Sequence, residues 1–286
     1  MLTRLAITIV TFFVLFWSPR FVGTVAGTID GDNNNNNKNL DIGKLTIVPG
    51  PPDRPAIVML TDGSSKLNKF QTESINDKVD YAKHHNYTLI CGRSSLDKYR
   101  STTWSKLKLI HRVLSQTTHS MIFWLDVDTI IWDRQRTIES FLPSDSQVSM
   151  VAQLDLHRSM ESKYFNAGVL LIRKTDSMMD ILRQAYRQWQ IPIFQGLFYF
   201  DADQDAMNLA MAKSDVAAAS RDGGSGKGST AGRLDDHLDL KRYGQLWTLG
   251  KDRNQKPFVL HFPNCVNGRC APEYLRLYRE TMDIEV

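Results

Sequence analysis

Two aspartates near the middle of the chain, Asp126 and Asp128, follow directly on the apolar stretch Met121–Leu125. A short, unbroken apolar run is typical of a strand buried on both faces, and its carboxyl end lies where open α/β sheets bind ligands. An extended chain would point both carboxylates to one side, where they would repel each other unless a cation lay between them. The pair predicts a site for Mg²⁺ or Mn²⁺, hard cations that often bridge to substrate phosphates. The alternative is that the two aspartates only begin a loop.

Other polar residues occupy places where they could bind a nucleotide. Thr61 and Asp62 follow the apolar run Ala56–Leu60 and are candidates for contacts with a base or ribose, or else cap a turn. Lys106 falls in a predicted helix, where it is either a point charge for phosphates and neighbouring carboxylates or a solvated surface residue.

The elements that would position these residues alternate between strand and helix. Apolar runs predict strands at 56–60, 87–91 and 121–125, and helical periodicity predicts helices at 70–86 and 104–114 between them. This β-α-β-α-β order favours a parallel, Rossmann-like sheet. Further strands are predicted at 148–152, 165–173 and 258–262, and further helices at 176–188 and 203–212.

Composition limits the partners and divides the chain. The 286 residues carry a net charge of +4 without a basic stripe interleaved with aromatics, so nucleic acid is not an expected partner.

Arg4 precedes an apolar run of 13 residues, Leu5–Trp17, which predicts a signal peptide or an uncleaved signal anchor over residues 1–25. Residues 26–51, with the polar tract GDNNNNNKN, are expected to be a flexible stem, and 52–286 a single α/β domain. In an oxidising lumen Cys265 and Cys270 could form a disulfide, or they could be two thiols.

Six motifs occur in an order that resembles one enzyme family. They are DYAKHHNY (80–87), WSK (104–106), LDVDTIIWD (125–133), FNAGVLLIR (165–173), DQD (203–205) and HFPNC (261–265). The series, from about Ile57 to Cys270, is similar to glycosyltransferase family 34, the galactosyl-, mannosyl- and xylosyltransferases of the Golgi. Family 8 shares two of the motifs and is a close competitor. Both families imply a GT-A fold, which is α/β with a mostly parallel central sheet, and a retaining, metal-dependent transferase.

The resemblance also implies roles for particular residues. Asp126, Asp128 and His261 would bind the metal, with Asp126 also near the ribose, and the imidazole favours Mn²⁺ over Mg²⁺. Asn166 and Gly168 would let the backbone approach the sugar. Asp203 would orient the sugar hydroxyls, and Gln204 would support an oxocarbenium-like transition state. Arg269 is the nearest cation where relatives carry a lysine for the leaving diphosphate.

The implied function is transfer of galactose, xylose or mannose from a nucleotide-diphosphate sugar to a glycan or glycoprotein acceptor. The expected location is the Golgi membrane, as a single-pass type II protein, or the lumen or the exterior if the N-terminal segment is cleaved. Two alternatives stay open. A haloacid dehalogenase-like phosphatase would use Asp126 as its nucleophile, although Thr129 and Ile130 do not fit that motif. A non-catalytic carbohydrate- or nucleotide-binding relative would keep the fold without turnover.

Overall fold

The structure is a computed structural model, and it describes most of the chain between residues 42 and 262. The described residues are 42–61, 69–92, 96, 102–142, 148–154, 165–188, 202–221, 258–262, 276 and 279. The predicted N-terminal segment, most of the predicted stem, Asp62, Arg269 and the two C-terminal cysteines lie outside these ranges.

The elements agree with the strands and helices predicted from sequence, with a few additions. In chain order they are α2 (Ile42–Leu45), β1 (Thr46–Val48), β2 (Ala56–Leu60), α3 (Lys69–His85), β3 (Thr88–Gly92), α4 (Thr102–Gln116), β4 (Met121–Leu125), β5 (Thr129–Ile131), the 3₁₀ helix η2 (Ile138–Phe141), β6 (Met150–Leu154), β7 (Phe165–Arg173), α5 (Asp176–Arg187), α6 (Ala202–Arg221) and β8 (Val259–His261). The additions are α2, β1, β5 and η2. Strand β1 joins the main sheet from within the segment predicted to be stem.

The main sheet has six strands in the order β1-β3-β2-β4-β7-β6. Strands β3, β2 and β4 are parallel, as their alternation with α3 and α4 predicts. Strand β7 is antiparallel to both neighbours, and Leu125 at the end of β4 pairs with Val169 in the middle of β7, so that residues 165–168 extend past β4. The amino end of β7 therefore lies beside the carboxyl end of β4, where the two aspartates follow.

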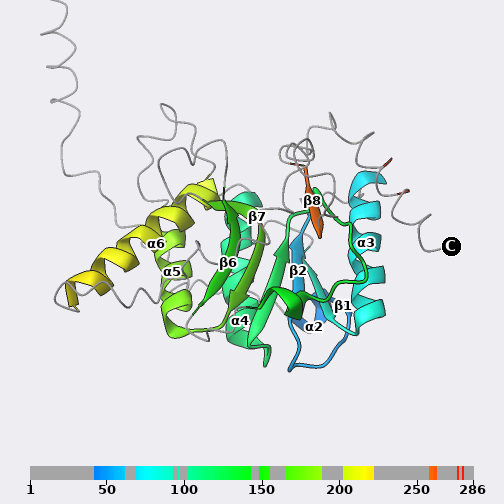
Figure 1. The fold of residues 1–286 in the computed structure, drawn as a ribbon, viewed down its shortest axis with the longest axis horizontal. Helices are drawn as coiled ribbons and strands as arrows, with labels where there is room; N and C mark the ends of the chain where they lie inside the picture. Colours follow the sequence, from blue (N-terminus) through cyan, green and yellow to red (C-terminus); the bar gives the residue numbers. More distant parts are fainter. Residues whose placement is uncertain are drawn as a thin grey trace, which may run out of the picture.

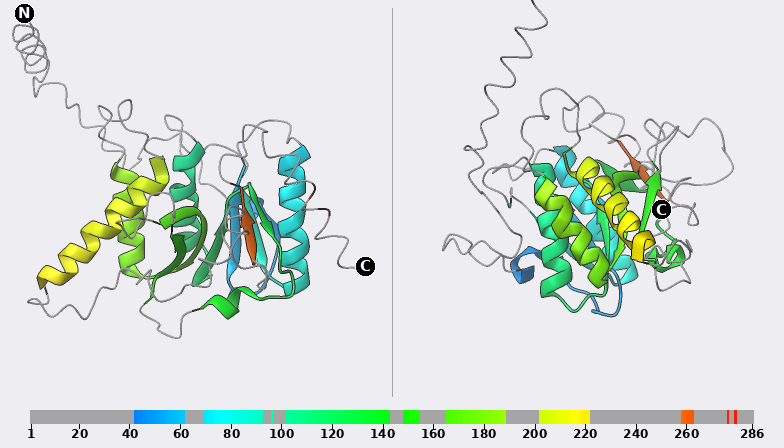
Figure 2. Two further views of the ribbon diagram at one scale, coloured as in Figure 1. Left: turned by 45° about the horizontal axis from the view of Figure 1, so that its top comes forward. Right: turned by 90° about the vertical axis from the view of Figure 1, so that its left-hand side faces the viewer.

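Helices cover both faces of the sheet, as Figure 1 shows. Alternate residues of β2 point to opposite faces: Ala56, Val58 and Leu60 join a core formed with α4, α5 and α6, whereas Ile57 and Met59 join a core with α3. Figure 2 shows α4, α5 and α6 packed together on the first side. Since every residue of β2 and β3 is buried, their continuous apolar runs are explained.

A second, two-stranded sheet joins segments that are far apart in the sequence. Strands β5 and β8 are antiparallel, with Thr129 opposite His261, and the Phe262 amide donates to the Asp128 carbonyl at 2.8 Å. Its Ile131 and Val259, and Phe258 just before β8, pack in the same core as α3. This pairing places the predicted histidine ligand next to the second aspartate.

Helix α3 ends in a turn that leads directly into β3. Asn86 adopts a left-handed conformation with φ 57°, and the Tyr87 amide donates to the Ala82 carbonyl at 2.8 Å. Asparagine tolerates this conformation better than most residues do, so it is a suitable residue to stop the helix. Within the described part of the chain, none of the helices combines the length and the apolar character needed to cross a bilayer.

Candidate metal centre

The site is built on a turn that follows β4. Val127 and Asp128 lie in this turn, and the Thr129 hydroxyl donates to the Asp126 carbonyl at 2.7 Å. The expectation that an extended backbone points both aspartates to one side is therefore wrong at this point, because the hydrogen-bonded turn replaces the extended conformation. The turn still keeps the carboxylates near each other. Ligand atoms of Asp126, Asp128 and His261 all lie within 4.8 Å of one another.

Asp128 and His261 form the more deeply buried part of this cluster. Their side chains are 8% and 5% exposed, and Asp128 Oδ1 lies 3.4 Å from His261 Nε2. Burial alone would raise the pKa of Asp128, but its electrostatic interaction and hydrogen bond with His261 outweigh burial and lower that pKa. Asp128 is thus held as a carboxylate, which is the form that binds a cation.

Gly168 leaves the space that the imidazole occupies. A Cβ at this position would lie 2.2 Å from His261 Cε1 and 2.5 Å from Nε2, distances that no real side chain tolerates. The sequence predicts that this glycine allows the backbone to approach a sugar. The structure adds a nearer reason, since only glycine at this position of β7 lets the His261 ring face Asp128.

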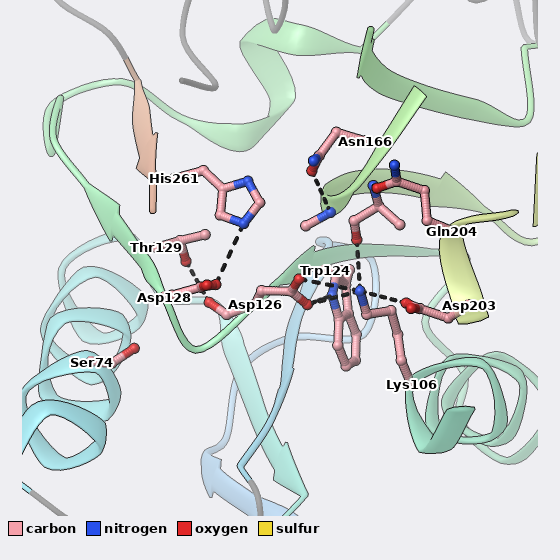
Figure 3. A network of polar contacts seen from close by, with 12 residues as sticks. Ser74, Lys106, Trp124, Asp126, Asp128, Thr129, Asn166, Asp203, Gln204 and His261 are labelled. Atoms are coloured by element: carbon pink, nitrogen blue, oxygen red, sulfur yellow. Dashed lines mark hydrogen bonds and ion pairs between the residues drawn. The ribbon is translucent and has the colours of Figure 1, made fainter. Parts of the chain in front are cut away.

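Lys106 connects Asp126 to Asp203 on the opposite side of the cluster, as Figure 3 shows. Its ammonium lies 3.0 Å from Asp126 Oδ1 and 2.7 Å from Asp203 Oδ2, and it donates to the Ala167 carbonyl at 3.0 Å. The indole of Trp124 donates to Asp126 Oδ1 at 2.7 Å. Lys106 was expected to be either a point charge beside phosphates and carboxylates or a solvated surface residue. The structure agrees with the first alternative, because the ammonium forms ion pairs with neighbouring carboxylates.

The charges of this triad shift the pKa values of its members. Burial alone would lower the pKa of Lys106, but the two carboxylates outweigh it and raise that pKa. Burial and the charge of Asp128 raise the pKa of Asp126, against the opposing effect of Lys106. A cation placed between Asp126 and Asp128 would relieve this repulsion.

Gln204 and Asn166 hold the start of β7 in place beside the triad. The Gln204 side-chain oxygen accepts from the Ala167 amide at 2.9 Å, and the Asn166 side-chain oxygen accepts from the Gly168 amide at 2.8 Å. The Gly168 carbonyl in turn accepts from the Asp126 amide at 2.8 Å. These bonds fix the backbone that surrounds Lys106 and His261.

Most of the residues predicted from sequence therefore come together at one edge of the sheet. The assembled set is Lys106, Asp126, Asp128, Asn166, Gly168, Asp203, Gln204 and His261. Thr61 is fully buried, and its hydroxyl donates to the Gly92 carbonyl at 3.3 Å, which matches the alternative of a cap at the end of its strand. Sequence reasoning missed Trp124 and the Ala167 carbonyl, because neither an indole in an apolar strand nor a backbone oxygen gives a signal in a sequence pattern.

The donor set fits a divalent cation. Two carboxylates and one imidazole, with ligand atoms within 4.8 Å of one another, match the mixed oxygen and nitrogen ligands that Mn²⁺ accepts more readily than Mg²⁺ does.

Comparisons with known proteins agree with this geometry. The model of the galactosyl transferase GMA12/MNN10 family, glycosyltransferase family 34, matches residues 53–271. Two relatives from Arabidopsis thaliana are "Probable xyloglucan 6-xylosyltransferase 3", 25% identical over 49% of this chain and 30% of that protein, and "Xyloglucan 6-xylosyltransferase 4", 27% identical over 47% and 25%. The matched stretch thus spans about a quarter to a third of these relatives.

A solved structure shows the same fold. It is a glycosyltransferase involved in the glycosylation of the major capsid of PBCV-1, similar with a TM-score of 0.55 and 12% identity over 78% of this chain and all of that one. The predicted GT-A fold is confirmed. The comparisons give no support to a phosphatase or to a non-catalytic relative.

Proposed function

The chain belongs to the galactosyl transferase GMA12/MNN10 family, and from this membership we propose that it is a metal-dependent glycosyltransferase. Its reaction moves a sugar from a nucleotide-diphosphate donor to a glycan acceptor. The observation that carries the proposal is the cluster of Asp126, Asp128 and His261 at the carboxyl end of β4, where α/β sheets bind nucleotides.

Each residue of the cluster has its own role in binding the cation or the sugar donor. Asp128 and His261 would hold a divalent cation from the side of the β5–β8 sheet, and Asp126 would hold it from the end of β4. When bound, Mn²⁺ supplies positive charge that stabilises the diphosphate as the glycosidic bond breaks. The Lys106 ammonium lies between the carboxylates of Asp126 and Asp203, so that Asp126 could face the cation and Asp203 could orient the sugar hydroxyls. Gln204 lies next to Asp203 and supports the positively charged transition state.

The donor is a UDP- or GDP-sugar that carries galactose, xylose or mannose. Support comes from the family description and from the relatives described as xylosyltransferases. The acceptor is a glycan or glycoprotein, and transfer retains the anomeric configuration. Residues 1–25 hold the protein in the Golgi membrane as a type II anchor. Support for this location is the apolar run Leu5–Trp17 behind Arg4.

The test is release of nucleotide from a panel of UDP- and GDP-sugars by the full chain, with Mn²⁺ or with EDTA. The proposal predicts slow hydrolysis of one donor that needs Mn²⁺ and disappears in Asp128→Ala. Asp133→Ala is the matched control, since it removes a nearby aspartate that lies outside the cluster and 3.9 Å from Arg136. If the chain neither hydrolyses a donor nor binds a nucleotide, the proposal is wrong. Phosphate release with a phosphorylated Asp126 would favour the phosphatase instead.

A further inference from the structure

Helix α3 carries two adjacent charged residues whose side chains are completely buried. Asp77 and Lys78 are both 0% exposed, and Lys78 Nζ lies 3.2 Å from Asp77 Oδ2. A buried ion pair of this kind is weak evidence for stability, because apolar residues of similar volume often stabilise a fold as well or better. The role of Asp77 and Lys78 therefore depends on the backbone groups that their side chains contact.

Those groups belong to the edge of β5 that faces away from β8. The Asp128 carbonyl accepts from the Phe262 amide and the Trp132 amide donates to the Phe258 carbonyl, at the two ends of β8. The backbone groups of Thr129 and Ile131 between them therefore face the other way. On that side Lys78 Nζ donates to the Thr129 carbonyl, and the Ile131 amide donates to Asp77 Oδ2 at 3.0 Å. Side chains of a helix thus replace the strand that would otherwise be needed to satisfy this buried edge.

Both charged side chains are themselves fixed by further partners. Ser74 Oγ accepts from Lys78 Nζ at 3.1 Å, and the Arg134 guanidinium donates to Asp77 Oδ1 at 2.9 Å. The position of β5 relative to α3 is therefore set by polar contacts of defined direction, which apolar packing alone would not supply.

The same short strand sets the positions of two candidate metal ligands. Thr129 directly follows Asp128 in the chain and pairs with His261 across the sheet. Figure 3 shows Ser74 of α3 and the imidazole of His261 on opposite sides of the turn that carries Asp128. A shift of β5 would consequently move Asp128 and His261 together, away from Asp126.

We infer that Asp77 and Lys78 are positioning residues of the metal centre, which hold β5 so that Asp128 and His261 converge on one cation. The inference rests on the proposed function, because it assigns the pair a purpose at the proposed metal site. Both side chains act through the backbone of Thr129 and Ile131, which they contact directly.

The experiment determines the Kd of the full chain for Mn²⁺. Electron paramagnetic resonance measures the concentration of free Mn²⁺ during a titration. Lys78→Met keeps the length and apolar volume of the side chain but removes the donor and its charge. We expect a rise in the Kd of about 10- to 100-fold, the range found when groups that orient metal ligands are removed. The folded state is checked by circular dichroism and cooperative unfolding without metal.

Glu139→Gln is the control, because it weakens a polar contact at the opposite end of the sheet, between η2, Arg54 and Tyr87. Its Kd for Mn²⁺ should equal that of the unaltered chain. If Lys78→Met fails to fold, Ser74→Ala removes only one contact of the ammonium and should still raise the Kd severalfold above the control.

An unchanged Kd in folded Lys78→Met, or in Ser74→Ala where the first variant cannot be used, overturns the inference. A failure of the proposed function is distinguishable, because then the unaltered chain itself would bind no Mn²⁺. In that case both the metal proposal and the positioning role are wrong.

Discussion

At the scale of single residues, the site depends on charges that balance one another at short range. Lys106 is the clearest case, since its ammonium lies within 3.0 Å of carboxylate oxygens from both Asp126 and Asp203. Only 8% of the lysine side chain is exposed. Its removal would leave two carboxylates close together in a poorly solvated place.

Lys106→Met should therefore destabilise the chain in the absence of metal. We expect a loss of about 3–5 kcal/mol in the free energy of unfolding, as for other buried pairs that lose one partner. Adding Asp203→Asn should restore part of this loss, because it removes one of the unpaired charges. Urea unfolding of the single and double variants measures both effects. Equal stability of Lys106→Met and the unaltered chain would contradict the electrostatic role.

Gly168 provides the second test at this scale. Gly168→Ala places a methyl group where the His261 ring lies, so the ring must move away from Asp128. We expect the affinity for Mn²⁺ to fall by at least about tenfold, as when a ligand loses its orientation. Val169→Ala is the control on the same strand, since it costs packing in the core without entering the cluster. Retained affinity in Gly168→Ala would show that the imidazole does not bind the metal.

At the scale of elements, the sequence predicts the type of most segments but not their directions. The runs at 56–60 and 121–125 and the periodicity of 70–86 depend on local burial, so strands β2 and β4 and helix α3 could be predicted. The antiparallel direction of β7 could not, because a buried strand has the same apolar pattern in either direction. Strand β5 has only three residues, too few for any period to show.

The same limit applies to the candidate site. The position of the two aspartates behind a buried strand indicates a cation site without any structure. His261 joins them only through pairing between β5 and β8, across more than a hundred residues, and the sequence suggested it by family resemblance alone. The sequence contains one signal for Lys78 that the predictions did not use. Lys78 lies four residues before Ala82 in α3, so both side chains are on the face of the helix that packs against the core.

The element η2 is tied to the amino ends of the strands by Glu139, which predicts a dependence of stability on pH. Burial alone would raise the pKa of Glu139, but hydrogen bonds from Arg54 and Tyr87 lower it below its ordinary 4.5. The folded chain therefore binds fewer protons at this group than the unfolded chain does. The stabilisation is complete above the unfolded pKa and is lost as the pH falls through the folded pKa.

Glu139→Gln should consequently lower the free energy of unfolding at pH 7 by roughly 0.5–1 kcal/mol, because the pair is about one third exposed and is screened by solvent. The difference from the unaltered chain should shrink as the pH falls below about 4. Urea unfolding at pH 7 and in acid measures it. A difference that stays constant over this range would show that the charge of Glu139 does not matter.

At the scale of the whole molecule, the cluster joins the two faces of the sheet. Lys106 and Asp203 come from α4 and α6 on one face, whereas Asp128 and His261 come from the turn and the small sheet that pack with α3 on the other. Asp126, at the end of the strand between them, contacts the first group and lies within ligand distance of the second. A cation bound at this place would therefore draw on both layers of the fold.

Calorimetric titration of UDP and GDP would test whether this cluster binds a nucleotide diphosphate through a divalent cation. The full chain would be titrated with Mn²⁺ and with EDTA, beside Asp128→Asn and the control Asp133→Asn. We expect one nucleotide to bind with Mn²⁺ and not with EDTA, Asp133→Asn to behave like the unaltered chain, and Asp128→Asn to lose the binding. Nucleotide binding of equal strength with EDTA, or in Asp128→Asn, would contradict this expectation.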